Sequence, residues 1–303
     1  MTSLVPRRCN VTGHRAAGSS KRPFFSRRAL MAAVSIWDDL PGFISFNTAY
    51  FIHFVSKVQA EVMDISGAIA EVGVAAGKSF GIMAHTRYGY EPLVACDIFK
   101  PGLEAGNVGD VNLPLFLDVM EAYQIAQEEI NIVQQDSLRL SDTDMVNNVD
   151  RAALARLRAA SPSPIPLTRD SKLVPRVGGF RLFHIDGAHY LEAALHDITT
   201  VACSMVQGGV VLIDDVHNFG WPGVQEAFNR YMLSHPQPRR LFPFLFTGRL
   251  FLTTSAWHAD GYRRHIQRSF PQAPVNAFHG QPVVGGVNLE LSAEDFSRLY
   301  DED

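Results

Sequence analysis

The sequence predicts an α/β fold, with a mostly parallel sheet, an antiparallel hairpin at one edge and helices on both faces. Strand and helix patterns alternate along the chain, which is typical of a parallel sheet. Most predicted strands are apolar on both faces, so helices must cover the sheet on both sides. Two late apolar segments, 242–246 and 250–254, are joined by Thr247-Gly248-Arg249 and predict the closing hairpin.

The remaining elements follow the same patterns of hydrophobic spacing. The predicted strands are residues 68–74, 93–96, 130–133, 181–185 and 209–213; one predicted helix begins at Gly77, and others span 113–126, 191–205 and 224–233. A first helix extends from Phe43 to Val62 and has an aromatic face. That face has three alternative roles: a cap over a site, packing on the core, or contact with a second subunit of a homo-oligomer.

Charge is distributed unevenly along the 303 residues. The chain has 31 acids and 27 lysines and arginines, a net charge of −4 without the basic excess of a nucleic-acid-binding protein. Residues 1–37 contain seven of these basic residues and no acid. We therefore expect a basic leader over 1–37 and a single domain over 38–303. The leader is either a transit peptide for plastids or mitochondria, or a disordered or mis-started end of a cytoplasmic protein.

Several classes of protein and site are disfavoured by composition. No segment reaches the roughly 20 apolar residues of a membrane span. Cys9, Cys96 and Cys203 are too widely spaced for a disulfide framework or a zinc site, and we expect the last two to be small buried side chains. Four prolines in residues 161–179 predict a loop or lid insertion there.

Acidic residues follow the predicted strands. Asp97, Asp136 and Asp186 each follow one strand, and Asp214 and Asp215 together follow another. Ligands of parallel sheets bind beyond the carboxyl ends of the strands, so these acids predict a ligand-binding edge. The alternative is that they cap strand-to-helix turns.

A glycine loop, Glu71-Val72-Gly73-Val74-Ala75-Ala76-Gly77-Lys78-Ser79, follows the first predicted strand. A phosphate-binding loop requires four residues between its glycines, and here there are three. A dinucleotide-binding loop requires G-x-G-x-x-G, but residue 75 is alanine. The segment instead fits the E-x-G-x-x-x-G loop with which class I methyltransferases bind S-adenosylmethionine (SAM).

The chemistry of SAM agrees with this loop. SAM has a cationic sulfonium and no phosphate, so it requires a close glycine turn and nearby carboxylates. Asp97 is placed for the ribose hydroxyls, and Asp136 with Ser137 for the adenine. The predicted SAM contacts are Glu71, Gly73, Val74, Gly77, Lys78, Ser79, Asp97, Asp136, Ser137 and Asp186. The alternative for Glu71 is a purely structural role in the loop.

Three acids at one edge also predict a metal site. Asp186, Asp214 and Asp215 would repel one another, and a hard divalent cation such as Mg²⁺ relieves this. Such a cation lowers the pKa of a bound hydroxyl, whose proton then passes to a base. His189 and His217 are the candidate bases, of which we favour His189; the alternative is that they only form hydrogen bonds around the site. His184 and His196 are expected to be structural.

These motifs resemble metal-dependent class I SAM O-methyltransferases that act on sugar hydroxyls of macrolide and aminocoumarin antibiotics. The resemblance covers Ile69–Met232 and depends on Glu71–Ser79, Ile185–Tyr190, Gly208-Gly209, Ile213–Asp215 and Trp221–Val224. It implies a Rossmann-like sheet, Mg²⁺ binding by Asp186, Asp214 and Asp215, and His189 as base; in some members the metal-binding Asp itself is the base. The proline-rich insertion and the C-terminal segment depart from the family.

The expected function is Mg²⁺-assisted methyl transfer from SAM to a hydroxyl of a small molecule, either a sugar, a polyol or another natural product. Related proteins of cephalosporin 7-methoxylation share the pattern, so the class of acceptor stays open. Two alternatives are a non-catalytic SAM-binding or regulatory protein on the same fold, and a P-loop nucleotide hydrolase.

Overall fold

The computed structural model describes residues 31, 34–88, 91–100, 111–149, 179–234, 240–285 and 293–300. Most of the predicted leader, the predicted insertion apart from Gly179, and Cys9 lie outside these residues. The leader, the insertion and the domain boundaries therefore remain predictions.

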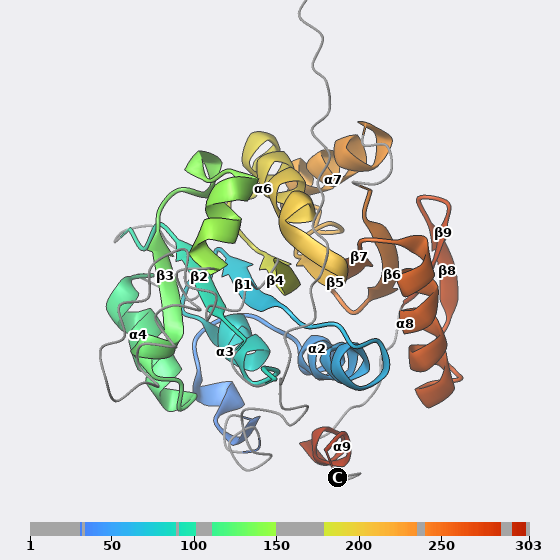
Figure 1. Ribbon diagram of the computed structural model, residues 1–303, viewed down its shortest axis with the longest axis horizontal. Helices are drawn as coiled ribbons and strands as arrows, with labels where there is room; N and C mark the ends of the chain where they lie inside the picture. The colour runs from blue at the N-terminus through green and yellow to red at the C-terminus, as the bar shows by residue number, and fades with distance from the viewer. Residues whose placement is uncertain are drawn as a thin grey trace, which may run out of the picture.

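A nine-stranded sheet runs through the centre of the molecule in the order β3-β2-β1-β4-β5-β7-β6-β9-β8 (Figure 1). The strands are β1 (Ala68–Val72), β2 (Leu93–Asp97), β3 (Ile130–Gln134), β4 (Phe180–Ile185), β5 (Met205–Ile213), β6 (Phe242–Phe246), β7 (Leu250–Thr253), β8 (Val275–Phe278) and β9 (Gln281–Val284). Strands β1 to β5 pair in parallel, and β7 is antiparallel to both β5 and β6. The predicted mostly parallel sheet with an antiparallel hairpin is confirmed.

Helices cover both faces of the sheet, as predicted (Figure 1). They are α2 (Phe46–Lys57), α3 (Lys78–Ala84), α4 (Leu113–Ala122), α6 (Leu191–Ser204), α7 (Pro222–Ser234), α8 (Ala256–Ser269) and α9 (Ala293–Arg298), with short turns η1 (Trp37–Asp39), η2 (Val58–Val62), η4 (Gln127–Glu129) and η5 (Ser137–Arg139). Helices α6 and α7 share one apolar core with the sheet, and α2, α3, α4 and α8 share the other. Neighbouring strand residues alternate between the two cores: Leu212 belongs to the second and Ile213 to the first.

The aromatic face of α2 is buried within the chain. Residues Thr48–Ser56 are all buried. The rings of Tyr50, Phe51 and Phe54 lie 5.9, 5.4 and 6.0 Å from the ring of Phe270. Of the three alternatives for this helix, the structure supports core packing of its aromatic face.

Some boundaries and elements differ from the prediction. The predicted helix over 113–126 ends at Ala122, because Gln124 has a left-handed φ of +59°. Helix α8 and the β8–β9 hairpin were not predicted, although Ala259, Tyr262 and Ile266 of α8 are buried at helical spacing. The β8–β9 hairpin extends the sheet, so the predicted hairpin is not its last edge.

Cys96 is buried as predicted, whereas Cys203 is half-buried. In the part of the chain that the structure describes, no helix combines the length and apolar character that crossing a membrane requires.

A buried arginine joins the elements at the amino ends of β1 and β4. Arg181 Nε donates to both carboxylate oxygens of Glu91, at 2.7 and 2.8 Å. The two Nη atoms donate to the Gln59 side chain at 2.9 Å and to the Thr86 carbonyl at 2.7 Å. Glu91 in turn accepts from the backbone N–H of Gly67, just before β1. This network fixes the sheet at the edge opposite the acids.

Replacement of this arginine is expected to destabilise the fold. Arg181→Met leaves the buried Glu91 without its counter-charge, which costs about 3–5 kcal/mol of unfolding free energy. Urea denaturation followed by circular dichroism measures the change. The control is Arg230→Met on the exposed face of α7, expected to change stability by less than about 0.5 kcal/mol. Equal losses in the two variants would contradict the assignment.

Candidate active site

The predicted acidic edge forms where neighbouring parallel strands end. The backbone N–H of Asp186 donates to the Val72 carbonyl at 2.9 Å, and that of Asp214 donates to the Ile185 carbonyl at 3.1 Å. These hydrogen bonds hold the two acids directly beyond the paired ends of β1, β4 and β5. Asp97 is the last residue of β2, at the same edge.

The glycine loop between β1 and α3 packs closely against this edge. Gly73 has a φ of +78°, and a Cβ atom there would lie 1.9 Å from the carbonyl oxygen of Asp186. Gly77 has a φ of +91°, and a Cβ atom there would lie 2.7 Å from Met120 Cε and 2.8 Å from the ring atom Phe116 Cδ2. Both positions therefore require glycine for conformation and for space, and the predicted tight turn is present.

Asp97 holds the glycine loop in place. Its Oδ2 accepts from the backbone N–H of Ala75 at 2.9 Å, and its Oδ1 accepts from that of Phe99 at 2.8 Å. Ala75 has a left-handed φ of +48°, which this hydrogen bond supports. Carboxylate oxygens have further lone pairs, so Asp97 retains the capacity to accept from a ligand hydroxyl.

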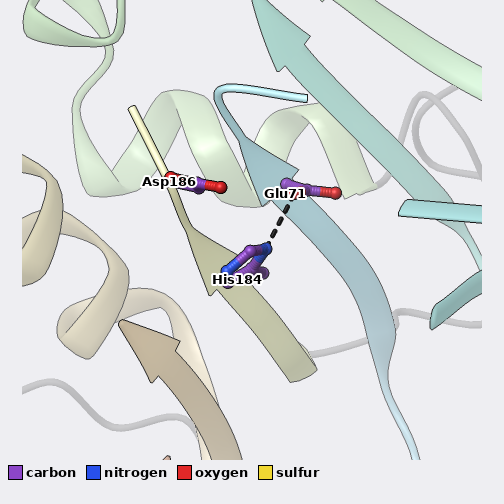
Figure 2. Close-up of side chains that lie close together, drawn as sticks. All are labelled: Glu71, His184 and Asp186. Carbon is purple, nitrogen blue, oxygen red and sulfur yellow. Dashed lines mark hydrogen bonds and ion pairs between the residues drawn. The ribbon is translucent and has the colours of Figure 1, made fainter. Parts of the chain in front are cut away.

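Glu71 of β1 is buried beside His184 of β4, and Figure 2 shows these side chains linked across the two strands, with Asp186 at the end of β4. Glu71 Oε1 accepts from Ser79 Oγ at 2.5 Å and lies 2.7 Å from His184 Nδ1. Among the described residues, Glu71 Oε2 has no hydrogen-bond partner. Burial raises the pKa of Glu71. Oε2 is an unsatisfied acceptor that a cationic or N–H ligand group would satisfy.

Two basic side chains compensate the three acids beyond β4 and β5. Arg249 Nη2 lies 2.6 Å from Asp214 Oδ2 and 3.7 Å from Asp186 Oδ2. His189 Nε2 lies 2.9 Å from Asp215 Oδ2 and 3.6 Å from Asp186 Oδ1. Asp186 therefore lies between the two basic groups, with one on each carboxylate oxygen.

This arrangement shifts the acids in opposite directions. Burial raises the pKa of Asp214 to about 6, and the neighbouring charge of Asp186 adds to the shift. Burial acts the same way on Asp186, but its hydrogen bond with His189 and nearby positive charges lower the pKa overall. Burial lowers the pKa of His189, but its hydrogen bonds to Asp186 and Asp215 outweigh this and raise it to about 9.

The second candidate base occupies a different environment. The exposed His217 ring packs edge-on against Phe246 and Phe278, with centroid distances of 4.9 and 5.0 Å. Burial lowers its pKa. The geometry therefore joins His189, but not His217, to the ion pairs of the acids among the described residues.

The predicted adenine residues form the turn after β3. Asp136 caps η5 by accepting from the backbone N–H of Leu138 at 3.0 Å. The Ser137 side chain is hydrogen-bonded to the buried Asp197 of α6, whose pKa burial raises to about 6. Both residues are thus fixed in the turn, with the Asp136 side chain exposed.

Val74 and Lys78 complete the predicted loop contacts. Val74 is buried. Lys78 Nζ donates to the Leu40 carbonyl at 3.2 Å and lies 5.0 Å from the centre of the Trp37 ring. Burial lowers the pKa of Lys78. This lysine therefore connects the segment before α2 to the first turn of α3 through a hydrogen bond and a cation–π contact.

A cavity of about 570 Å³ opens beside the acids. Its lining includes Phe43, Ser45, Thr48, Lys78, Thr247 and Arg249 as well as Asp214 and Asp215. Apolar, hydroxyl and charged groups therefore meet beside the acidic edge, in a space large enough for a small molecule.

The segment that holds the glycine loop and the acids matches a known protein family. Residues 70–216 match a family model described as a methyltransferase domain. This segment is similar to a methyltransferase domain. The matched segment extends from β1 past the end of β5 and includes Asp97 and all three acids of the edge. The predicted resemblance to methyltransferases, and with it the enzyme class, is confirmed.

Solved structures of low sequence identity are also similar to the methyltransferase domain and its surroundings. CalS11, a TDP-rhamnose 3'-O-methyltransferase of calicheamicin biosynthesis, is 17% identical with a TM-score of 0.42, covering 75% of this chain and 93% of that chain. The O-methyltransferase NovP is 14% identical with a TM-score of 0.45, covering 68% and 80%. MycE of the mycinamycin pathway, in complex with Mg, SAH and mycinamycin VI, is 14% identical with a TM-score of 0.42, covering 75% and 54%. A comparison with curated proteins gave no match.

Two residues near the acidic edge of the sheet are not among the predicted site residues. His184 is buried within β4, as expected of a structural histidine, and its Nδ1 lies 2.7 Å from Glu71 Oε1. The sequence predicts Arg249 only as part of a turn, yet its Nη2 lies 2.6 Å from Asp214 Oδ2. Arg249 directly precedes β7. Because β7 pairs antiparallel with β5, β7 begins beside the end of β5, where Asp214 follows.

The contact between the glycine loop and Asp186 can be tested by substitution. Gly73→Ala adds a Cβ 1.9 Å from the Asp186 carbonyl, and Gly280→Ala adds one at a similar φ, +70°, with nothing within 4 Å. Both variants pay the left-handed backbone cost of about 1–2 kcal/mol, and Gly73→Ala is expected to lose at least about 2 kcal/mol more. Thermal unfolding measures the difference. Equal losses of stability in the two variants would show that the glycine loop is not in close contact with the Asp186 carbonyl.

Proposed function

We propose that the methyltransferase domain transfers a methyl group from SAM to a hydroxyl oxygen of a small molecule, assisted by Mg²⁺ or another hard divalent cation. The observation that supports this most directly is the position of Asp186. Its carbonyl contacts the glycine loop, while its carboxylate lies between His189 and Arg249. A cofactor on the loop and a hydroxyl at the acids would therefore be neighbours.

The residues around the glycine loop fit SAM. Glu71, Gly73, Gly77 and Asp97 would hold it: the glycines leave room for close approach, and the unpartnered Glu71 Oε2 provides a buried negative acceptor. The bound cofactor supplies the methyl group on a positively charged sulfur. Carboxylates are its complement, since opposite charges attract strongly in a partly buried site.

The acids fit a divalent cation by charge and by spacing. Asp186, Asp214 and Asp215 with Arg249 leave two negative charges when His189 is neutral, which a divalent ion balances. One oxygen each of Asp186 and Asp215, with a His189 nitrogen, lie within 4.8 Å of one another. Asp186 and Asp215 would hold the ion, with Asp214, the third predicted ligand, held beside them by Arg249. The ion would lower the pKa of a bound hydroxyl.

His189 would receive the acceptor's proton. Its ring stacks on Trp221 with a centroid distance of 4.5 Å and an interplanar angle of 23°, which fixes its orientation. A base must first release its own proton, and the acids hold that proton as long as no other positive charge compensates them. The role of His189 as a base therefore agrees with a cation at the same edge.

The cavity beside the acids provides room for the acceptor. The half-buried Thr247 belongs to the lining, and its hydroxyl lies 2.9 Å from the hydroxyl of the buried Thr48. Phe43 is 62% exposed and adds an apolar surface. This mixture suits a sugar, a polyol or another polar natural product, which is the acceptor class that we propose.

Cofactor binding is tested with S-adenosylhomocysteine (SAH), the product form of SAM. Wild-type protein is expected to bind SAH, and Asp97→Ala to weaken binding at least tenfold, about 1.4 kcal/mol, because both the loop contact and the acceptor are lost. Isothermal titration calorimetry measures the affinities. Asp118→Ala, an exposed acid on α4, is the control and should bind as wild type does. Wild-type protein that fails to bind SAH would overturn the proposal.

The cation is tested with Mn²⁺ as a spectroscopic probe. Asp186→Asn is expected to weaken Mn²⁺ binding at least tenfold by electron paramagnetic resonance, since the amide carries no charge, whereas Asp118→Ala should have no effect. Turnover is followed as SAH release with a panel of sugars and polyols. Activity should disappear in EDTA and return with Mg²⁺; full activity in EDTA would exclude the cation. SAH binding without turnover on any acceptor would favour the non-catalytic alternative.

A further inference from the structure

Arg249 is brought to the acidic edge by the β6–β7 hairpin. Leu250, the first residue of β7, pairs with Ile213, the last residue of β5. Since the two strands are antiparallel, the residue before Leu250 lies beside the residue after Ile213, which is Asp214. The Arg249 side chain is only 7% exposed, so its charge must be satisfied within the protein.

The guanidinium of Arg249 contacts three separate segments of the chain. Its Nε donates to His184 Nε2 on β4 at 3.0 Å. Its Nη2 donates to the Phe43 carbonyl, before α2, at 2.6 Å and pairs with Asp214 Oδ2 at 2.6 Å. The planar guanidinium is suited to such simultaneous contacts because its donors point in fixed directions.

The contact with Arg249 determines where His184 carries its proton. An arginine side chain only donates, so His184 Nε2 must be an acceptor without a proton. The proton of the neutral ring is then on Nδ1, which lies 2.7 Å from Glu71 Oε1. Arg249 thereby orients His184 as a donor to Glu71.

We propose that Arg249 and His184 are positioning residues that connect Asp214 at the acidic edge with Glu71 at the start of the glycine loop. The polar chain continues from Glu71 Oε1 to the Ser79 hydroxyl at the start of α3. All its members except the half-buried Asp214 are buried, and hydrogen bonds in such surroundings strengthen one another. This inference rests on the proposed SAM-binding role of the loop.

The connection has a consequence for cofactor affinity. Without Arg249, the His184 ring can place its proton on either nitrogen, and the hydrogen bond that holds Glu71 in place is weakened. The glycine loop would then become less rigid, although Arg249 lies on a separate element, the β6–β7 hairpin. An arginine that merely neutralised Asp214 would have no such effect on the loop.

Lysine at position 249 separates these two roles. Arg249→Lys keeps a positive charge for Asp214, but a single ammonium cannot also reproduce the fixed donation to His184. SAH affinity measured by calorimetry on the full chain is expected to fall at least fivefold in Arg249→Lys and in His184→Gln. The double variant should lose no more than the weaker-binding single variant, because both changes break one connection. Arg230→Met on α7 is the matched control and should bind as wild type does.

A second measurement does not depend on binding. Nitrogen-15 NMR of the histidine rings in wild-type protein should show His184 as the neutral form with its proton on Nδ1, and this signature should change in Arg249→Lys. Three results would overturn the proposed connection through Arg249 and His184. They are a wild-type His184 proton on Nε2, an Arg249→Lys variant that binds SAH as wild type does, and losses of SAH affinity in the two single variants that add in the double variant. Should His184→Gln fail to fold, Arg249→Lys and the wild-type spectrum still decide. Wild-type protein that binds no SAH would instead overturn the proposed function.

Discussion

Repulsion among Asp186, Asp214 and Asp215 is the constraint on which the rest of the site depends. The parallel strands β4 and β5 bring these carboxylates to one edge, and their burial makes uncompensated charge costly. Compensation comes from two other segments: Arg249 from the hairpin turn and His189 from the loop after β4. The antiparallel β7 is thus part of the site, because it places the arginine beside the acids.

Two polar networks join β1 and β4 at opposite ends of an otherwise apolar pair of strands. At the amino ends, Arg181 holds Glu91, which in turn accepts from Gly67. At the carboxyl ends, His184 contacts Glu71. Because these partners face each other only in one register, a slip of one residue would leave buried charges unpaired. The networks therefore determine the register that aligns the glycine loop with Asp186.

The strands and the acids at their ends could be predicted because their signals are local. A buried strand requires a continuous apolar run, and a following Asp is visible in the sequence itself. The helix α8 was missed because its sequence is largely polar, and its buried residues include His258 and Arg263 beside the apolar Ala259, Tyr262 and Ile266. His184 and Arg249 were missed as site residues because their partners, Glu71 and Asp214, are distant in sequence. These residues meet only because β1 pairs with β4 and β5 pairs with β7.

The sequence by itself determined the order of strands and helices, the glycine loop and the set of acids at one edge, since these depend on local spacing and on the common direction of parallel strands. Only the tertiary structure decided which charges compensate those acids. It placed His189 rather than His217 among them, and it added Arg249. The physical reason is that ion pairing depends on distances of a few ångströms between side chains from separate elements, and those distances are established only when the sheet and its loops pack together.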